Sequence, residues 1–468
     1  MKIKNRNALL RHGDIESKRI LLDIADETLR QLDAQHRIKN LLHIHKGRLI
    51  IGKRTWDLQK QRRIYLLGAG KACNAMAGAV EEVLGDYLTE GIISVKILEE
   101  SDQFIKTKVY IGGHPTPNEE GQKASLAMLD MINTAQPHDL FICVVSGGSS
   151  ALLNCPAEGI TLADEIRVTD ILLKSGAGIR DINAVRRHIS RTNGGQLAQQ
   201  IAERGADMIC MTIRDAIGAA PTKDISVPVA YTATPFGSDD TTLEDARQTV
   251  HNYCLADILP ANVVAYLAED GPAKETPKAF PQFSYYVINT LPDACIIARQ
   301  VAENMGVNAI ILSSFIEGEA SEVGKFFAGI AREIYHYGRP AAPPCILISA
   351  GEAVTRIAHD IVVEGHGGPS QEMVTGFALA AGKIPGAALF SIDTEGTDGT
   401  TKYAGGLTDS TTLTHAMESG VDFYKALRVH ATSEALEALH CCVFTGNTGT
   451  NLCDLNLLYV ANSKKKGE

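Results

Sequence analysis

Three glycine-containing stretches of the 468-residue chain are suited to holding an anion. The first, Gly68-Ala69-Gly70-Lys71, follows the apolar run at residues 64–67 and precedes a helical pattern that extends to about residue 84. Glycines let the backbone approach an anion, and the start of a helix presents free N–H groups. We therefore expect Gly68 and Gly70 to contact a phosphate-bearing cofactor and Lys71 to neutralise its charge. A plain glycine turn with a solvent-facing lysine would leave the same pattern, and the spacing is not that of a Walker motif.

The second stretch, Ser146-Gly147-Gly148-Ser149-Ser150, follows the strongest strand pattern of the chain, at residues 140–146. Two glycines and three hydroxyls stand where a carboxylate or phosphate would meet backbone donors. The residues expected to bind this anion are Ser146, Gly147, Gly148 and Ser149. The alternative is a close turn that merely needs positive φ angles.

The third stretch, Gly446-Asn447-Thr448-Gly449-Thr450-Asn451, follows a short strand pattern at residues 442–445. It has the same combination of glycines and short polar side chains as the second stretch. Gly446, Thr448 and Asn451 are therefore candidates for binding a cofactor.

Carboxylates gather in Asp393-Thr394-Glu395-Gly396-Thr397-Asp398-Gly399. Hard oxygen ligands are what Mg²⁺ requires, and a nucleotide would bring that ion with it. Asp393 and Asp398 are the candidate metal ligands. Aspartates also cap turns through their side chains, which would explain the same positions without a metal.

The elements that must position these residues alternate between short apolar runs and longer helical patterns. This order recurs at residues 64–84, 140–152 and 208–213, and repeated β-then-α order favours a mostly parallel sheet covered by helices. Residues 16–43 have the pattern of one amphipathic surface helix. A stretch rich in proline and charge at residues 271–283 has the composition of a linker. We therefore expect two α/β domains, at residues 1–270 and 284–468, the second opening with a strand at 285–290.

Composition excludes several functional classes. Hydrophobic residues make up 45% and charged residues 21% of the chain, as in ordinary globular proteins, and the net charge of −10 disfavours nucleic acid as a partner. The ten cysteines include no CxxC pair, which fits reduced thiols in the cytoplasm. We expect no membrane span and no signal peptide. Whether copies associate into a homo-oligomer stays open.

The order of motifs along almost the whole chain resembles that of the glycerate 2-kinase family, the class II glycerate kinases with a C-terminal MOFRL domain. The matching stretches lie at residues 68–72, 113–117, 146–153, 182–190, 317–320, 367–372, 397–399 and 444–451. They include Gly-His-Pro-Thr-Pro at 113–117 and Ile-Asn-Ala-Val-Arg-Arg-His-Ile-Ser at 182–190. The resemblance implies a Rossmann-like N-terminal domain with helices on both faces of a parallel sheet, and a smaller α/β C-terminal domain.

The resemblance also implies an activity and roles for several residues. The chain would transfer phosphate from ATP, with Mg²⁺, to glycerate or a related small polyhydroxy acid. Lys71 would be a catalytic cation, and the anion held by the serine-glycine loop at residues 146–150 would be the substrate or a phosphate. Arg186 would pair with the substrate carboxylate, with Arg187 the weaker candidate. Asp215 would be the carboxylate held near the attacking hydroxyl.

Several positions depart from the family pattern, so the chain resembles a diverged member. Pro369 stands where relatives carry an arginine, while Asn193 and Gln196 replace two further cations. Two later carboxylates become Ala219 and Ala220. Phosphoryl transfer depends on positioned cations, so other side chains must compensate. The candidates for this role are Arg214, Arg180, Arg191 and His366, and we favour Arg214 as a catalytic residue.

Two other functions stay open at this point. One is an NAD(P)-dependent hydroxypyruvate reductase, although residues 68–73 lack the third glycine of the dinucleotide-binding pattern. The other is a diverged protein that binds a hydroxy acid without catalysis, which the missing cations would allow.

Overall fold

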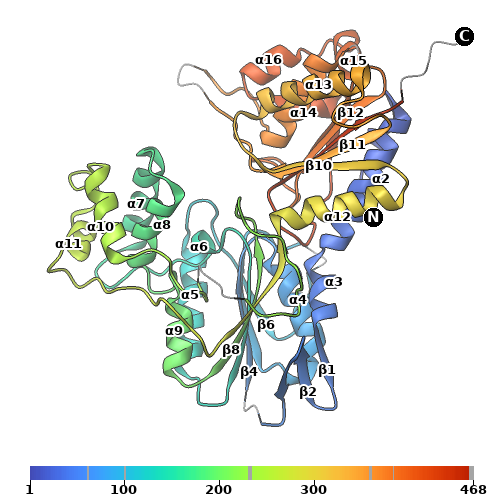
Figure 1. Ribbon diagram of the computed structural model, residues 1–468. Helices are drawn as coiled ribbons and strands as arrows, with labels where there is room; N and C mark the ends of the chain where they lie inside the picture. The colour runs from blue at the N-terminus through green and yellow to red at the C-terminus, as the bar shows by residue number, and fades with distance from the viewer. Residues whose placement is uncertain (61–62, 100–101, 230–234, 358–360, 383, 463–468) are drawn as a thin grey trace, which may run out of the picture. The chain divides into compact units, whose positions relative to one another are not determined.

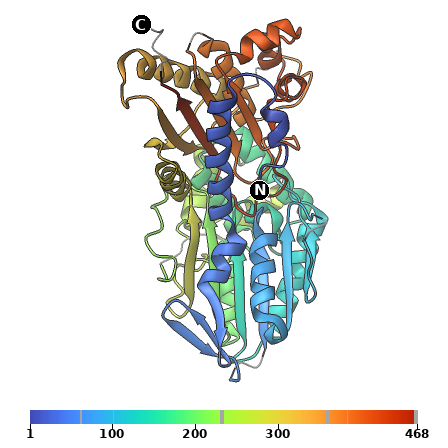
Figure 2. The same ribbon diagram turned by 90° about the vertical axis from the view of Figure 1, so that its right-hand side faces the viewer.

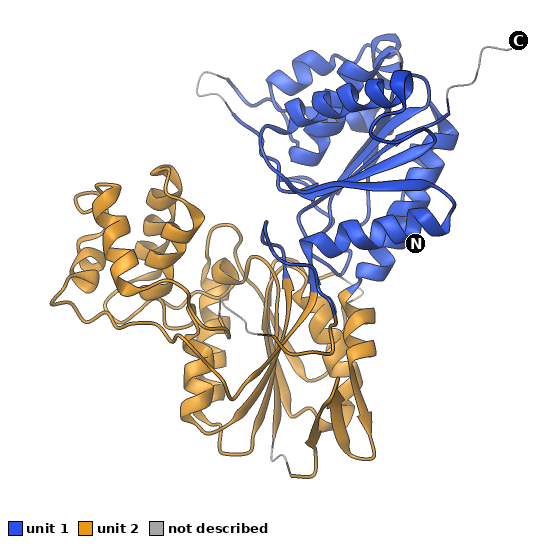
Figure 3. Cartoon of the chain, viewed as in Figure 1, with its two compact units in different colours: residues 1–33, 214–223, 289–468 blue, residues 34–213, 224–288 orange. Residues whose placement is uncertain are grey.

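The computed structural model describes residues 1–60, 63–99, 102–229, 235–357, 361–382 and 384–462. The chain divides into two compact units, each assembled from segments that are distant in sequence (Figure 3). Unit 1 comprises Met1–Asp33, Arg214–Lys223 and Asn289–Glu468, and unit 2 comprises Ala34–Ile213 and Asp224–Ile288. Within the described residues, no helix is both long and apolar enough to cross a membrane.

A six-stranded sheet forms the centre of unit 2 (Figure 1). Its strands follow the order β6-β5-β4-β7-β8-β9. Its strands are β4 (Ile64–Ala69), β5 (Glu90–Val95), β6 (Thr107–Ile111), β7 (Leu140–Val145), β8 (Asp207–Arg214) and β9 (Ser284–Thr290). Neighbouring strands from β6 to β8 run parallel. Numbered along the chain, this order is 3-2-1-4-5-6, the arrangement of the Rossmann fold. The order reverses between β4 and β7, and such sheets bind ligands outside the carboxyl ends of the strands at that point.

Helices cover both faces of this sheet. On one face, α5 (Glu119–Asn133) and α9 (Gln196–Glu203) share a hydrophobic core with Tyr65 and Leu67 of β4. Successive side chains of a strand point to opposite faces, so Gly68 faces the other side, where α4 (Cys73–Leu84) packs on β4, β5 and β7. All residues of β4 and β7 are buried, as expected of parallel strands covered on both sides. The predicted Rossmann-like fold is confirmed.

Unit 2 also contains a group of helices and a small sheet. The helices are α7 (Leu162–Lys174), α8 (Ile179–His188), α10 (Leu243–Asn252) and α11 (Ala261–Leu267), grouped in Figure 1. They share a core of their own that includes Val168, Leu172 and Val185. After α3 (Ala34–Leu41), the three-stranded antiparallel sheet consists of β1 (Leu42–His45), β2 (Arg48–Ile51) and β3 (Arg54–Asp57).

Unit 1 is built on a mixed six-stranded sheet in the order β10-β11-β15-β12-β13-β14. Its strands are β10 (Asn308–Ile316), β11 (Cys345–Gly351), β12 (Ala387–Asp393), β13 (Gly405–Asp409), β14 (Cys442–Val443) and β15 (Asp454–Val460). Only β10 and β11 pair in parallel among these strands as described. The core beside the sheet includes Phe327 of α13 (Ala320–Tyr337) and Phe377 of α14 (Pro369–Ala381). Three short helices follow: α15 (Thr412–Glu418), α16 (Phe423–Arg428) and α17 (Thr432–Ala438).

The N-terminal segment belongs to unit 1. After α1 (Arg6–Leu9), α2 (Ile15–Leu32) packs against α12 (Leu291–Asn304) and also contacts β12 and β15 (Figure 2). Leu21, Leu22 and Leu29 on α2 are fully buried. The single surface helix predicted at residues 16–43 is therefore two helices, α2 and α3, and α2 is a core element of unit 1.

The compact units differ from the predicted segments 1–270 and 284–468. Residues 1–33 belong to unit 1 because the apolar face of α2 is buried there. Residues 214–223 also belong to unit 1, where Asp215 bonds to Asn451 and Cys453. The strand predicted to open the second domain is β9, which instead joins the sheet of unit 2 next to β8. The stretch at residues 271–283, expected to be a linker, lies inside unit 2, and composition could not show which sheet the following strand joins.

Candidate active site

The first two of the three predicted glycine loops, at residues 68–71 and 146–150, lie side by side at the carboxyl ends of β4 and β7. In the parallel register, Ala69 stands opposite Val145. Beyond the strands, Ser146 N donates to Ala69 O at 3.2 Å and Lys71 N donates to Gly147 O at 3.0 Å. The strand order of the sheet reverses between β4 and β7. The loops therefore occupy the position where sheets of this order bind ligands.

Gly70 and Gly148 show why these loops contain glycine. Gly70 has a φ of +139°, and a Cβ there would lie 2.2 Å from Ser146 Oγ. Gly148 precedes α6 (Ser149–Leu152) and has a φ of +85°. A Cβ on Gly148 would lie only 2.9 Å from His114 Cδ2. A side chain at either position would collide with its neighbours and strain the backbone.

The hydroxyl of Ser146, predicted to bind substrate, stabilises the turn itself. Its Oγ accepts a hydrogen bond from Ala72 N at 2.9 Å, and the residue is only 2% exposed. Ser149 is also buried, at the start of α6. A ligand at this loop would therefore contact backbone groups more readily than the hydroxyls of Ser146 and Ser149.

Lys71 and His114 both lie against Gly148. A Cβ built on Gly148 would lie 3.3 Å from Lys71 Cγ and 3.2 Å from His114 Nε2. Both side chains are half-buried. His114 was not among the predicted site residues, although its Gly-His-Pro-Thr-Pro stretch follows a strand of the same sheet. That position could have indicated a residue at the same edge as the two loops.

Arg186 reaches the end of the serine loop from α8. Its Nη2 donates to Ser150 O at 3.2 Å, and Asn193 Nδ2 donates to the same oxygen at 3.4 Å. Arg187 points elsewhere: its Nη1 lies 2.6 Å from a carboxylate oxygen of Asp239, and the residue is buried. The structure thus brings Arg186, and not Arg187, to the predicted substrate loop.

In unit 1, the structure brings together two of the predicted residues. Asn451 Nδ2 donates to Asp215 Oδ2 at 2.9 Å. The thiol of Cys453 donates to Asp215 O at 3.2 Å. Asp215, on the segment after β8, is therefore held by the residues that end the third glycine loop.

The third loop packs against the acidic turn that follows β12. Thr448 N donates to Glu395 O at 3.3 Å, and the buried hydroxyl of Thr448 donates to Thr394 O. Gly446 has a φ of +65°. The Thr448 hydroxyl thus serves the loop's own structure.

Asp398 caps a helix, the alternative that the sequence left open. Its Oδ1 accepts from Ser370 N at 3.1 Å and its Oδ2 from Gln371 N at 2.9 Å, at the start of α14. Burial raises the pKa of this carboxyl to about 7, against the opposing effect of the Gln371 hydrogen bonds. Both oxygens thus cap α14, and a role of Asp398 as a metal ligand stays a prediction. Asp393 also holds a turn, since its Oδ1 accepts from Glu395 N at 3.0 Å.

Among the described residues, no group of three histidine, cysteine, aspartate or glutamate side chains is arranged to hold a metal ion. An Mg²⁺ ion that comes with a nucleotide commonly needs only one or two protein carboxylates. Asp393 and Asp215 therefore stay candidates for contacting a nucleotide-bound ion.

Two of the proposed replacement cations are engaged in ion pairs. Arg180 lies 3.3 Å from Asp240 on the helical group, and His366 Nδ1 lies 2.8 Å from Glu434. Arg214 is the last residue of β8 and is half-buried. Arg214 therefore stays the preferred candidate.

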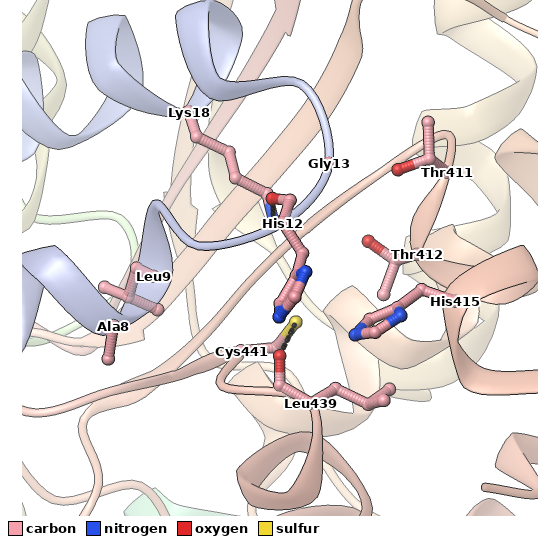
Figure 4. A pocket seen from close by; sticks show the side chains of 10 residues that line it. All are labelled: Ala8, Leu9, His12, Gly13, Lys18, Thr411, Thr412, His415, Leu439 and Cys441. Atoms are coloured by element: carbon pink, nitrogen blue, oxygen red, sulfur yellow. Dashed lines mark hydrogen bonds between the residues drawn. The ribbon is translucent and has the colours of Figure 1, made fainter. Parts of the chain in front are cut away.

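A separate small cavity in unit 1 lies between the N-terminal segment and the loops around α15 (Figure 4). The imidazoles of His12 and His415 are 4.4 Å apart between ring centroids, and Lys18 Nζ donates to His12 O at 2.9 Å. Desolvation and the nearby positive groups lower the pKa of His12. The ten residues that line the cavity include none of the predicted site residues.

Comparison with known proteins identifies the family. The family described as "Domain of unknown function (DUF4147)" matches residues 20–268, and the MOFRL family matches residues 345–454. A curated relative, the "Glycerate 2-kinase" of Pyrococcus horikoshii, is 32% identical over 453 residues, which cover 96% of this chain and 99% of the relative. The chain belongs to the glycerate kinase family. The predicted resemblance is confirmed.

A solved structure from the glycerate kinase family has the same fold as this chain, whereas the names of its relatives differ from one another. The crystal structure of a glycerate kinase from Thermotoga maritima superposes with a TM-score of 0.77 at 28% identity, and covers 95% of this chain and 99% of its own. A relative from Agrobacterium vitis, 32% identical over 85% of this chain and 99% of its own length, is named "Putative hydroxypyruvate reductase".

Proposed function

We propose that this chain is a kinase that transfers the terminal phosphate of ATP to glycerate or a related small hydroxy acid. The observation that carries the proposal is the pair of glycine loops, with Lys71, at the point where the strand order of a Rossmann-like sheet reverses. Membership of the glycerate kinase family supports the same activity.

Phosphoryl transfer requires that the reacting groups be positioned and that charge be neutralised. In this proposal, Lys71 stabilises negative charge on the phosphate beside the backbone of the serine loop. Arg186 pairs with the carboxylate of the hydroxy acid, as a guanidinium suits a planar carboxylate. Asp215 accepts the proton of the attacking hydroxyl, and the loop from Gly446 to Asn451 contacts the nucleotide.

Mg²⁺ would supply charge neutralisation on the nucleotide phosphates. We expect activity to require a divalent ion, with Asp393, Asp398 or Asp215 in contact with it directly or through water. An excess of chelator should abolish turnover, and added Mg²⁺ should restore it. Full activity in the chelator would remove the metal from the proposal.

A nicotinamide-dependent reductase is the weaker alternative. Residues 68–73 read Gly-Ala-Gly-Lys-Ala-Cys and lack the third glycine of the dinucleotide-binding pattern, which lets the helix pack closely on the strand. The kinase names outweigh that of the Agrobacterium protein, since relatives from an archaeon, a bacterium and vertebrates are all named as glycerate kinases. The cytoplasmic location expected from the cysteines stays a prediction.

The test is a panel of small hydroxy acids and sugar acids, each incubated with ATP and Mg²⁺ and followed by ADP release. A parallel panel of keto acids with NADH and NADPH follows loss of nicotinamide absorbance. We expect ADP release with glycerate or a close relative, and no reduction. Reduction without ADP release would establish the reductase, and binding without either reaction would establish a non-catalytic binding protein.

A further inference from the structure

Glu165 is a buried carboxyl group for which the proposed reaction has no use. It lies in the first half of α7 and is only 2% exposed. Within the part of the chain that the structure describes, its Oε2 has no hydrogen-bond partner. A buried carboxylate that lacks compensating hydrogen bonds is costly in the ionised form. Glu165 should therefore respond strongly to any charge that arrives nearby.

Arg186 lies on α8, which packs against α7 and shares a hydrophobic core with it. The positive charge of Arg186 favours the ionised form of Glu165, and the negative charge of Glu165 in turn favours the charged guanidinium. Within the described residues, no hydrogen bond joins Arg186 to Glu165. The Nη2 of Arg186 bonds to Ser150 O, and its buried Nε has no hydrogen-bond partner among the described residues.

The other ionisable groups around this pair are few. Arg187 follows Arg186 on α8, and its positive charge acts on Arg186, but its own guanidinium is paired with Asp239. Cys155 lies before α7, and burial raises the pKa of its thiol. The charge of Glu165 raises this pKa further, whereas that of Arg191 lowers it. Arg186 is thus the cation that Glu165 and an incoming anion at the serine loop would share.

We propose that Glu165 competes with the carboxylate of the substrate for Arg186, so that binding of the hydroxy acid is coupled to uptake of one proton by Glu165. The proposal rests on the proposed function, and specifically on Arg186 as the substrate's partner. When the anion binds, two carboxylates face one guanidinium in a poorly solvated site, and one of them must be neutral. The proton comes from solvent and returns to it when the product leaves. Glu165 is a positioning residue, since it acts through Arg186.

The sign of the pH dependence follows from the state of the free protein. Burial raises the pKa of Glu165 to about 7, against the opposing effect of Arg186. Below that pH the group is already neutral, and binding needs no proton. Above it, each bound substrate must take up a proton, so the affinity falls by up to about tenfold per pH unit until the pKa of the complex is reached.

The test measures KM for the preferred acid at pH 6.5, 7.5 and 8.5 in the wild type and in Glu165→Gln, which keeps the shape and removes the titration. We expect the wild-type KM to rise about tenfold or more across this range, while that of Glu165→Gln changes less than twofold. Asp170→Asn is the matched control, because Asp170 lies on the same helix, is exposed and pairs with Lys174. It should keep the wild-type profile. Glu165→Met provides a second neutral variant, and thermal melts check that both fold.

Calorimetry gives a second reading that needs no turnover. Glycerate is titrated into each protein at pH 8 in two buffers that differ in heat of ionisation. We expect uptake of close to one proton per bound molecule in the wild type and none in Glu165→Gln. Equal proton uptake, or the same rise of KM in both proteins, would overturn the role of Glu165 even if ADP release proves the kinase. Absence of ADP release with every acid would instead overturn the proposed function, and the calorimetry would still decide on Glu165.

Discussion

Lys71 is the residue on which the proposed chemistry depends most. It follows two glycines at the end of β4, and its stem lies against Gly148 of the serine loop. Replacing it with alanine removes a half-buried cation and little core packing. We predict that Lys71→Ala lowers kcat by at least about 100-fold, with an unchanged melting temperature.

The control for this variant is Lys123→Ala. Lys123 is exposed on α5 and pairs with Glu120 at 2.6 Å, a surface contact worth little. Its rate should match the wild type. An unchanged rate in Lys71→Ala would remove the catalytic assignment.

Arg214 carries the second prediction at this scale, because the family resemblance implies an arginine at the position where this chain has Pro369. If Arg214 supplies the missing charge, it acts mainly in the transition state. Arg214→Gln should then lower kcat by roughly tenfold to a thousandfold with little change in KM. Arg180→Gln, at an arginine already paired with Asp240, should leave both constants near their wild-type values. Wild-type kinetics in Arg214→Gln would favour a substrate or reaction unlike that of glycerate kinases.

At the level of single residues, the sequence predicted the position of the glycine loops better than the role of each side chain in them. Gly68, Gly70 and Lys71 lie at the carboxyl end of β4, beside the point where the strand order reverses. The hydroxyl of Ser146 and the carboxylate of Asp398 instead bond to backbone N–H groups. A serine that binds substrate and a serine that closes a turn have the same sequence signal, so only the three-dimensional neighbours separate the two roles.

The junction of β4 and β7 is the element that tests how tightly the site is built. A Cβ on Gly70 would collide with Ser146, and the φ of +139° is unfavourable for other residues. We predict that Gly70→Ala costs about 1–3 kcal/mol of stability and most of the activity, because both loops must move apart. Urea unfolding and ADP release would measure the two effects.

Gly329→Ala is the comparison variant. Gly329 lies inside α13 and has open space around its Cα. Alanine there should stabilise the helix by about 0.5–1 kcal/mol. A Gly70→Ala protein as stable and active as the wild type would show that the two loops are not closely coupled.

The elements themselves were predictable where local pattern decides. The helical pattern expected to extend to about residue 84 is α4, which ends before Gly85 with its φ of +52°. β15 was not predicted, although it pairs with both β11 and β12 at the centre of its sheet. Its residues give no signal of their partners, because strand pairing is settled by contacts distant in sequence.

At the scale of the molecule, the discontinuous units give a prediction about folding. Three fully buried leucines of α2 each contribute about 1.5–3 kcal/mol by burial, a large part of a typical domain's stability. Residues 289–468 produced alone should therefore lack cooperative unfolding, while the same segment fused to residues 1–33 should regain it. Circular dichroism during urea titration would measure this. Cooperative unfolding of the shorter fragment at the same midpoint would contradict the assignment of α2 to unit 1.

The measurement that tests the central claim most directly is analysis of the reaction product. The protein is incubated with ATP, Mg²⁺ and glycerate, and phosphorus NMR follows the appearance of a phosphate ester together with ADP. We predict that the ester and ADP form in equal amounts with the wild type, and that both are lost in Lys71→Ala. Unchanged ATP and glycerate after prolonged incubation with folded wild-type protein, or ADP release without any phosphate ester, would contradict the assignment of this chain as a hydroxy-acid kinase.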